Sequence, residues 1–262
     1  MPSEITSIHN PKIKQWSQLL TKRARESQGQ FLLEGVHLIQ EALQAGIHIH
    51  TILYSLEKKF PVELSRMTSL VTEWIGVSEA VLTKCSDTQT PQGVVAVTEK
   101  LKWTLQSFME KENGLVIAID GVQDPGNLGT IIRSADAVGA TGIILGRGTV
   151  DLYNSKTVRA TMGSMFHLPI VEGDLVELLP EASKQGIQLI SASLTANRSC
   201  YEVDMTGATW FIVGNEGSGI SAEIESLVSQ KVIIPMPGRA ESLNVAMAAT
   251  VLLFEAARQR LV

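Results

Sequence analysis

The sequence is poor in cysteine and has no long hydrophobic run. Cys85 and Cys200 are the only cysteines among 262 residues, and neither stands in a CxxC pair or near paired histidines. Two such thiols exclude a disulfide framework and a zinc cage, so a reducing cytoplasm is the expected location. The longest apolar run, Val245 to Phe254, is interrupted by Thr250 and is far shorter than the about 18 residues of a membrane span. We therefore expect neither secretion nor membrane insertion.

Motifs for metal and nucleotide binding are also missing. The histidines show no paired spacing typical of a metal site, so we expect no metal and interpret each histidine as a surface or core residue: His9, His37, His48, His50 and His167. No Gly-Lys-Ser or Gly-Lys-Thr exists in the chain, which excludes a P-loop kinase. The chain also lacks the G-x-G-x-x-G motif, which excludes an ordinary dehydrogenase.

The charge of the chain is slightly negative and unevenly distributed. Lys and Arg number 22 against 27 Asp and Glu, and the net charge of −5 argues against a protein that coats nucleic acid with a generally basic surface. Residues 1–30, in contrast, hold five basic residues and two acidic ones. Four of the basic residues are candidate phosphate contacts: Lys12, Lys14, Arg23 and Arg25. A solvated helix face would give the same pattern, so charge alone leaves both interpretations open.

Length and composition predict two folded domains. The chain is 44% hydrophobic and 19% charged, which is typical of folded proteins, and domains run to about 100–200 residues. Residues 99–112 are charged and interrupt the apolar runs, so we interpret them as a helical linker. Before this linker, residues 12–20 and 35–45 carry helical spacing, and short strand-like runs follow at Ile49 to Tyr54 and at Val94 to Thr98. This pattern predicts a small α/β domain over residues 1–98.

Residues 113–262 have the regular pattern of a second α/β domain. Short apolar runs alternate with helical stretches, and we expect strands at Leu115 to Ile119, Gly142 to Leu145, Gln188 to Ser191, Trp210 to Val213 and Val232 to Ile234. Continuously apolar runs suit strands that are covered on both faces, which predicts a parallel sheet between helices. Ligands bind such sheets beyond the carboxyl ends of the strands, so the loops after Ile119, Val213 and Ile234 are the candidate site.

The first of these loops leads into a predicted helix. Asn127 is placed to cap this helix, and Arg133 lies off its apolar stripe, where it could meet a ligand. Equally, Asn127 could be only a cap and Arg133 could pair with Asp136, so this loop alone decides nothing. We interpret Asp120 and Asp124 as turn and cap residues rather than as an acid and a base.

The second and third loops have unusual residues as well. GNEGSGIS, residues 214–221, has three glycines around Glu216; these permit close approach to a ligand, although a tight connection would also use them. The third loop enters a long helix for which Ser242 is the expected N-cap. Asn244 in the first turn is unusual, because asparagine is a mediocre helix former. Alanines at 246, 248 and 249 allow close approach by another element, within the fold or across a dimer.

Together the three loops resemble the SpoU (TrmH-like) family of RNA ribose 2′-O-methyltransferases, within the SPOUT class. DPGNLGTIIRSADAVGA, IVGNEGSGIS and IPMPGRAESLNVAMAA match the three family motifs in order and with family-like spacing. KTVRATMGSMFHLPIV at residues 156–171 is also similar. Residues 9–35 resemble the start of the amino-terminal RNA-binding domain that many members carry. The resemblance covers nearly the whole chain.

This resemblance implies a fold and a cofactor that composition and spacing do not reveal. It predicts a parallel-sheet SPOUT domain with a deep trefoil knot, preceded by a smaller α/β RNA-binding domain, and a catalytic unit that is a homodimer. S-adenosylmethionine would bind in the knotted loops. Matched by position to the family motifs, the expected contacts are Gly214, Ile234 and Leu243, with Met236 and Ser193 as neighbours.

The resemblance also implies a reaction centre made of Asn127, Arg133, Glu216, Ser242 and Asn244. Methyl transfer needs the ribose hydroxyl in line with the methyl group, so positioning can supply much of the acceleration. A guanidinium stays protonated, with a pKa above about 12, so we expect Arg133 to bind a neighbouring phosphate and stabilise developing alkoxide charge. Asn127 and Asn244 would orient Arg133, and Glu216 would fix the first loop.

The expected function is transfer of a methyl group from S-adenosylmethionine to a ribose 2′-hydroxyl of RNA. Ribosomal RNA is the favoured substrate, because the amino-terminal extension resembles that of rRNA-directed members, and transfer RNA is the alternative. A knotted methyltransferase that modifies a base is disfavoured by the Asn127 to Arg133 motif, which belongs to the ribose-methylating branch. A catalytically silent RNA-binding protein is a further alternative, which the intact Arg133, Glu216, Ser242 and Asn244 disfavour.

Overall fold

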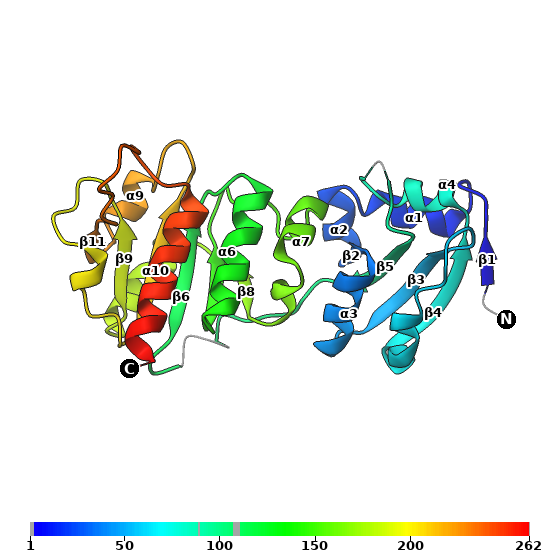
Figure 1. Cartoon of the computed structure of the whole chain (residues 1–262), viewed down its shortest axis with the longest axis horizontal. Coiled ribbons are helices and arrows are strands. Elements are labelled where there is room, and N and C mark those ends of the chain that lie inside the picture. Colours follow the sequence, from blue (N-terminus) through cyan, green and yellow to red (C-terminus); the bar gives the residue numbers. More distant parts are fainter. Residues whose placement is uncertain (1–2, 89, 107–110, 262) are drawn as a thin grey trace. The chain divides into compact units, whose positions relative to one another are not determined.

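The computed structural model describes residues 3–88, 90–106 and 111–261, and the chain divides into two compact units (Figure 1). The first unit contains Met1–Lys102 together with Asp151–Phe166. The second unit contains Trp103–Val150 and His167–Val262. Each unit has its own β-sheet, so each is described by itself.

The first unit is an α/β unit with a mixed five-stranded sheet in the order β1-β4-β3-β5-β2. β4 pairs in parallel with β1 and β3, whereas β5 runs antiparallel to β3 and β2. The strands are β1 (Ser3–Ile5), β2 (Gln30–Glu34), β3 (Ile49–Ser55), β4 (Val71–Val77) and β5 (Val94–Glu99). The small α/β domain expected from the sequence therefore exists, with its strand-like runs at β3 and β5.

Short helices cover this sheet because their apolar residues face it. The first helix begins after Asn10, whose side chain accepts from the Lys12 backbone N–H at 2.9 Å. Its buried Ile13 and Trp16 share one core cluster with Leu53 of β3. The helices are α1 (Pro11–Gln18), α2 (Lys22–Gln28), α3 (Val36–Gln44) and α4 (Glu79–Lys84), with a 3-10 segment η1 (Val62–Leu70).

Residues 151–166 belong to the first unit although they lie in the second half of the sequence. The buried ring of Tyr153 packs on Phe31 with 4.8 Å between ring centroids. Arg159 Nη1 donates to Asp87 Oδ1 at 2.6 Å. The assignment of all of residues 113–262 to one domain therefore differs from the structure here, because these aromatic and charged side chains find their partners in the first unit. The segment contains α7 (Ser155–Thr161) and the 3-10 turn η2 (Ser164–Phe166).

Arg25 holds this segment and is not a surface residue. Its side chain is buried, and its guanidinium donates to Asp151 Oδ2 at 2.6 Å and to the Leu19 carbonyl at 2.8 Å. A buried, charge-paired guanidinium is costly to expose, because Asp151 would lose its partner. The structure thus corrects the prediction that Arg25 contacts RNA phosphate.

The expected helical linker at residues 99–112 is only partly open to comparison. Residues 107–110 of this stretch lie outside the described residues. Residue 99 is the end of β5, and residues 100–104 have no helical structure. The helical interpretation is therefore wrong for the first part of the linker, where the chain continues from a strand.

The second unit is built on a six-stranded parallel sheet with the order β11-β9-β10-β6-β7-β8. The parallel sheet predicted from the continuously apolar runs is confirmed. β8, which has three residues, was not predicted, and the last strand ends at Val232 rather than at Ile234. The strands are β6 (Leu115–Asp120), β7 (Gly142–Leu145), β8 (Ile170–Glu172), β9 (Gln188–Ala192), β10 (Thr209–Gly214) and β11 (Gln230–Val232).

Helices cover both faces of this sheet. Leu179 of α8 and Ile224 of α9 share a core cluster with Val116 and Ile212, which point to one face. α6 and α10 lie side by side (Figure 1), and there the hydroxyls of Ser134 and Thr250 are 2.7 Å apart. The elements are α6 (Pro125–Ala137), α8 (Leu175–Lys184), the 3-10 turn η3 (Cys200–Glu202), α9 (Ala222–Glu225) and α10 (Val245–Arg260). None of the helices in the described part of the chain is long and apolar enough to cross a membrane.

The register of the central strands positions the loops. β6 and β10 are neighbours, and Gly214 pairs with Asp120 at their carboxyl ends. The first and second loops therefore leave the sheet next to each other. This adjacency is the basis of the candidate site.

Candidate functional site

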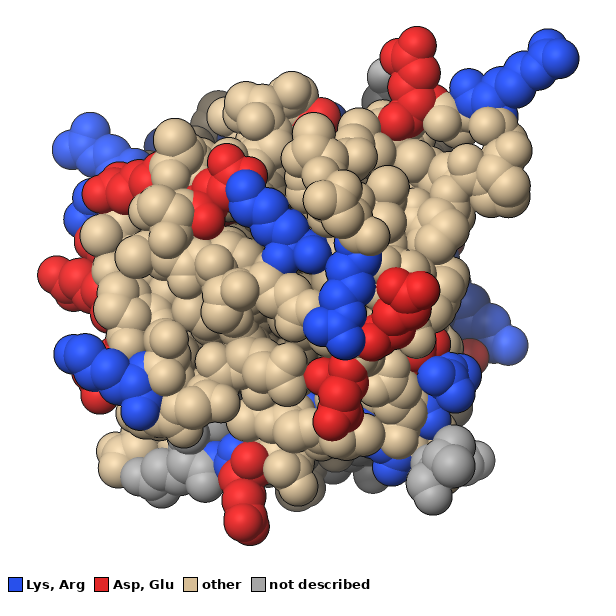
Figure 2. Space-filling model, turned by 90° about the vertical axis from the view of Figure 1, so that its left-hand side faces the viewer, with Lys and Arg blue, Asp and Glu red and all other residues tan. Residues whose placement is uncertain are grey.

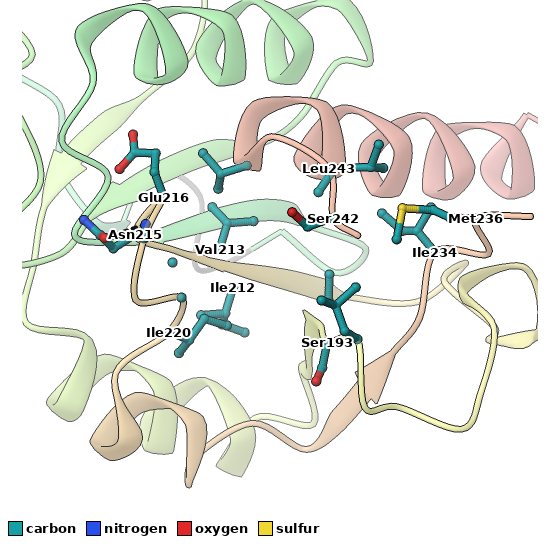
Figure 3. Close-up of a pocket in the computed structure, with 17 residues that line it drawn as sticks. Ser193, Ile212, Val213, Asn215, Glu216, Ile220, Ile234, Met236, Ser242 and Leu243 are labelled. Atoms are coloured by element: carbon teal, nitrogen blue, oxygen red, sulfur yellow. Dashed lines mark hydrogen bonds between the residues drawn. The ribbon is translucent and has the colours of Figure 1, made fainter. Parts of the chain in front are cut away.

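A cavity of about 390 Å³ opens at the carboxyl edge of the second sheet (Figure 3). It is lined by the ends of β9 and β10, by the loop after β11 and by the start of α10. The structure brings all five predicted cofactor residues to this cavity: Ser193, Gly214, Ile234, Met236 and Leu243. Glu216 and Ser242 line it as well, with Glu216 at one end in the view of Figure 3 and Met236 at the other.

The glycines of the second loop are required by a close approach of the backbone. A Cβ atom added to Gly214 would lie 2.2 Å from the carbonyl carbon of Gly219, so the loop could not fold back in this way. Gly219 itself has a φ of +72°, which side chains rarely adopt. The second loop is therefore both a tight connection and part of the wall of the cavity, two interpretations that the sequence left as alternatives.

Glu216 ties this second loop to the first. Its Oε2 accepts from the Gln123 backbone N–H at 3.1 Å, and its Oε1 accepts from the Asp124 N–H at 3.0 Å and from Asn127 Nδ2 at 2.9 Å. Burial alone would raise the pKa of Glu216, but the hydrogen bonds from Asn127, Asp124 and Gln123 lower that pKa to about 2. Glu216 is therefore ionised at neutral pH and is a weak base.

Asn127 is not the cap that the sequence suggested. Asp124 caps α6, because its Oδ1 accepts from the Asn127 N–H at 2.8 Å and Pro125 takes the first helical position. The interpretation of Asp124 as a cap residue is confirmed. The Asn127 side chain is free for the site, where it donates to Glu216 and its Oδ1 accepts from Asn244 Nδ2 at 3.0 Å.

Asn244, and not Ser242, is the N-cap of α10. Its Oδ1 accepts from the backbone N–H groups of Ala246 at 2.9 Å and Met247 at 3.4 Å. The prediction that the helix starts at Ser242 is wrong by two residues. Asparagine looked unusual inside a first turn, but as a cap it is favoured, and its amide N–H remains available for Asn127. One side chain therefore fixes both the helix start and the contact between the first and third motifs.

Arg133 stands apart from this network. It is exposed on α6 and is not among the residues that line the cavity. Its suggested partner Asp136 instead bonds His167, whose Nδ1 lies 2.8 Å from Asp136 Oδ2. Among the described residues, Arg133 has no ion pair or hydrogen bond, so the interpretation as an Arg133–Asp136 pair is wrong and the guanidinium is available to a ligand.

The remaining predicted RNA contacts lie on the surface of the first unit. Lys14 and Arg23 are exposed. Lys12 is exposed too, although its Nζ lies 3.0 Å from Glu73 Oε2. Such exposed ion pairs contribute at most about 1 kcal/mol, so phosphate can compete for Lys12.

The described residues include no group of three or more His, Cys, Asp or Glu side chains that could hold a metal ion. Several residues that line the cavity were not predicted from the sequence, notably Leu194, Asn215 and Ile220. Asn215 had a detectable signal, because it lies between Gly214 and Glu216 in the second motif. Leu194 and Ile220 have no distinctive spacing, and only the folding of their loops brings them to the cavity.

Comparison with known proteins agrees with this geometry. The sequence model of the SpoU rRNA Methylase family matches residues 114–254, and that of the MRM3-like substrate binding domain matches residues 10–96. A 23S rRNA (guanosine(2553)-2′-O)-methyltransferase of Bacillus subtilis (strain 168) is 36% identical, covering 96% of this chain and 98% of its own. A 23S rRNA (uridine(2479)-2′-O)-methyltransferase of Streptomyces viridochromogenes is 35% identical, covering 98% and 92%.

Solved structures are similar over the same length. The SpoU methyltransferase AviRb from Streptomyces viridochromogenes in complex with the cofactor AdoMet has a TM-score of 0.87 at 34% identity, covering 97% of this chain and 99% of that one. An AdoMet-bound rRNA methyltransferase from Sinorhizobium meliloti has a TM-score of 0.86 at 34% identity, covering 98% and 97%. The likeness therefore includes both units.

The unusual pKa of Glu216 can be tested by removing one donor. In Asn127→Ala we expect the pKa of Glu216 to rise from about 2 toward its ordinary value of 4.5. Stability from the ionised carboxylate is present above the unfolded pKa and is lost as pH falls through the folded pKa, so the variant should lose it at higher pH. Carbon-13 NMR titration of the carboxyl group measures the shift. Gln123→Ala is the control, because it retains its backbone N–H; an equal shift in both variants, or none in Asn127→Ala, would contradict the assignment.

Proposed function

The chain belongs to the SpoU rRNA Methylase family, and on this premise we propose that it transfers a methyl group from S-adenosylmethionine to a ribose 2′-hydroxyl of ribosomal RNA. The observation that carries the proposal is the joining of the cavity to a chain of side chains, Glu216 to Asn127 to Asn244, contributed by all three motifs. The whole-length similarity to named rRNA ribose methyltransferases supports ribosomal RNA over other RNA.

The cavity suits this cofactor. Its volume of about 390 Å³ falls within the about 300–1,000 Å³ of small-molecule sites, and glycine backbone and apolar side chains line most of it. We propose that the contacts are Ser193, Gly214, Ile234, Met236 and Leu243. When bound, S-adenosylmethionine supplies an electrophilic methyl group on a sulfonium. The chain itself supplies orientation, and no metal is needed in this proposal.

Each residue of the proposed reaction centre has a role that fits its surroundings. Glu216 is too weak a base to take the hydroxyl proton efficiently, so it fixes the first loop through its hydrogen bonds. The side-chain amides of Asn127 and Asn244 each keep one orientation, because Asn127 donates to Glu216 and Asn244 donates to Asn127. Ser242 contributes its hydroxyl at the cavity wall. Arg133 holds a phosphate next to the reacting ribose and stabilises the developing alkoxide.

The proposed role of Arg133 predicts a defect in turnover without a defect in binding. Arg133→Lys keeps the positive charge but removes the planar donor fork, so turnover should fall by about 100-fold while affinity for cofactor and RNA stays near normal. Transfer of labelled methyl to rRNA, followed by alkaline hydrolysis, measures this, because linkages with a methylated 2′-oxygen survive. Arg147→Lys, at another exposed arginine, is the control. Parental turnover in Arg133→Lys would disprove the role, and label recovered in mononucleotides after hydrolysis would disprove the ribose product.

We propose that the first unit binds the RNA through its basic surface. Lys12, Lys14 and Arg23 are the contacts, and Arg25 is excluded because it is buried. Figure 2 shows that an end face of the second unit has Lys, Arg, Asp and Glu interspersed over a mostly uncharged surface. This face offers no continuous basic track, so the charge for RNA affinity has to come from elsewhere on the molecule.

Removal of these charges should change how RNA binding depends on salt. Replacing Lys12, Lys14 and Arg23 by Ala should weaken RNA binding and lower the logarithmic salt slope by about three, one for each lost phosphate contact, with unchanged cofactor affinity. Titration at several salt concentrations measures the slope. A variant in which three cations of the second unit, Arg147, Lys184 and Lys231, are replaced by Ala controls for total charge. Equal slopes in the parent and the first variant would exclude this surface.

We also propose that the protein is a homodimer whose interface includes α10. Three apolar side chains at helical spacing on or just before this helix are exposed: Leu243 at 39%, and Met247 and Phe254 at 51% each. A stripe of this kind is costly in water, and a second copy could cover it. The trefoil knot and the cytoplasmic location stay predictions, supported by membership of the family and by the cysteine pattern respectively.

The dimer predicts a mass of twice 28.4 kDa in sedimentation at micromolar concentration. Phe254→Glu should shift the protein to a monomer, because it places a charge in the apolar stripe. Ile8→Glu changes an exposed apolar residue of the first unit and should leave the mass unchanged. A monomeric parent, or a dimeric Phe254→Glu protein, would contradict this interface.

A further inference from the structure

Asn215 forms more hydrogen bonds than its neighbours in the second loop, and no functional role has been proposed for it so far. It follows Gly214 directly and lines the cavity (Figure 3). Its backbone N–H donates to the Gly219 carbonyl at 2.8 Å, and its carbonyl accepts from the Gly219 N–H at 3.0 Å. These two bonds close residues 215–219 into a small loop.

The side-chain oxygen of Asn215 holds this small loop from inside. Oδ1 accepts from the backbone N–H of Gly217 at 2.9 Å and of Ser218 at 3.1 Å, and from the Ser218 hydroxyl at 3.2 Å. Gly217 and Gly219 line the cavity. We call these two glycines the rim of the cavity, and the position of this rim therefore depends on the Asn215 oxygen.

The side-chain nitrogen of Asn215 points to the first loop. Nδ2 donates to the Gly121 carbonyl at 2.9 Å. Two backbone donors face the oxygen and a carbonyl faces the nitrogen, so only one orientation of the amide satisfies both sides. Asp120 adds a further connection, because its Oδ2 accepts from the Ser221 N–H at 2.7 Å. Asn215 and Glu216 thus bind the same first loop at two points.

We propose that Asn215 is a positioning residue, which sets the rim of the cofactor cavity and ties it to the loop that carries Asn127. The inference rests on the proposed function for the identity of the cofactor. Glu216 fixes the catalytic part of the first loop, while Asn215 fixes the cofactor rim to its beginning at Gly121. Asn215 and Glu216 both form hydrogen bonds to backbone groups of the first loop, so together they fix the two loops in one relative position.

The experiment uses a variant of nearly equal shape. Asn215→Asp retains the oxygen that accepts from Gly217 and Ser218, but it replaces the donor that faces the Gly121 carbonyl with a second, anionic oxygen. We expect about tenfold weaker binding of S-adenosylmethionine by calorimetry at pH 8, together with lower turnover at saturating cofactor and an unchanged KM for RNA. Asn197→Asp, at an exposed position, makes the same change of charge and should bind as the parent does.

The pH dependence of cofactor binding distinguishes this positioning role of Asn215 from a general loss of structure in the variant. Repulsion from the Gly121 carbonyl raises the pKa of the new carboxyl, whereas the hydrogen bonds from Gly217 and Ser218 lower it, so this pKa is measured in the variant by carbon-13 NMR. As pH falls from 8 toward the measured pKa, the protonated carboxyl can again donate to Gly121, so the defect relative to the parent should shrink. The pKa of Glu216 is about 2, so its carboxylate stays ionised throughout. Asn215→Ala lacks both functions, and its defect should be at least as large and independent of pH.

Each result bears on the inference. Parental affinity in Asn215→Asp, or a defect that does not shrink as pH falls to the measured pKa of the new carboxyl, would overturn it. Should Asn215→Asp fail to fold by thermal unfolding, parental affinity in Asn215→Ala would overturn the inference and weaker affinity would support it. The proposed function fails separately, if the parent binds S-adenosylmethionine but methylates no rRNA.

Discussion

The carboxylate of Glu216 is the contact on which the candidate site depends. It spans from the second loop to two backbone N–H groups and one amide of the first loop, and these bonds lower its pKa to about 2. A carboxylate satisfied in this way stays ionised and keeps its position over the whole physiological range of pH. The parallel register of β6 and β10 makes the contact possible, since it places Gly214 beside Asp120.

The hydrogen-bond network extends from Glu216 to α10 through the side-chain amides of Asn127 and Asn244. Asn127 donates to Glu216 and accepts from Asn244, and Asn244 in turn caps the helix. Neither amide can flip without losing a partner, so three distant motifs share one fixed arrangement. Preorganisation of this kind suits a reaction in which in-line placement of the hydroxyl and the methyl group supplies much of the acceleration. Arg133 is exposed and unpaired among the described residues, which agrees with its proposed contact with a phosphate.

Much of this arrangement was predictable from the sequence, for physical reasons. Continuously apolar runs predicted the parallel sheet, and the resemblance of the motifs predicted the residues that the cavity and the Glu216 network bring together. The caps were misassigned by a few residues, although Pro125 after Asp124 was a usable signal for the start of α6. The burial of Arg25 was not predictable, because its partner Asp151 is 126 positions away and joins the first unit only in the folded chain. Local charge therefore suggested a surface residue where long-range packing makes an internal one.

Mapping of 2′-O-methylation across total rRNA is the sharpest test of whether this protein methylates a ribose in ribosomal RNA. The comparison is between the source organism with the gene intact, with the gene deleted, and with the deletion complemented by the parent or by Glu216→Ala. We expect at least one ribose methylation to disappear on deletion, to return with the parent gene and to stay absent or strongly reduced with Glu216→Ala. An rRNA methylation map that is identical with and without the gene would contradict it.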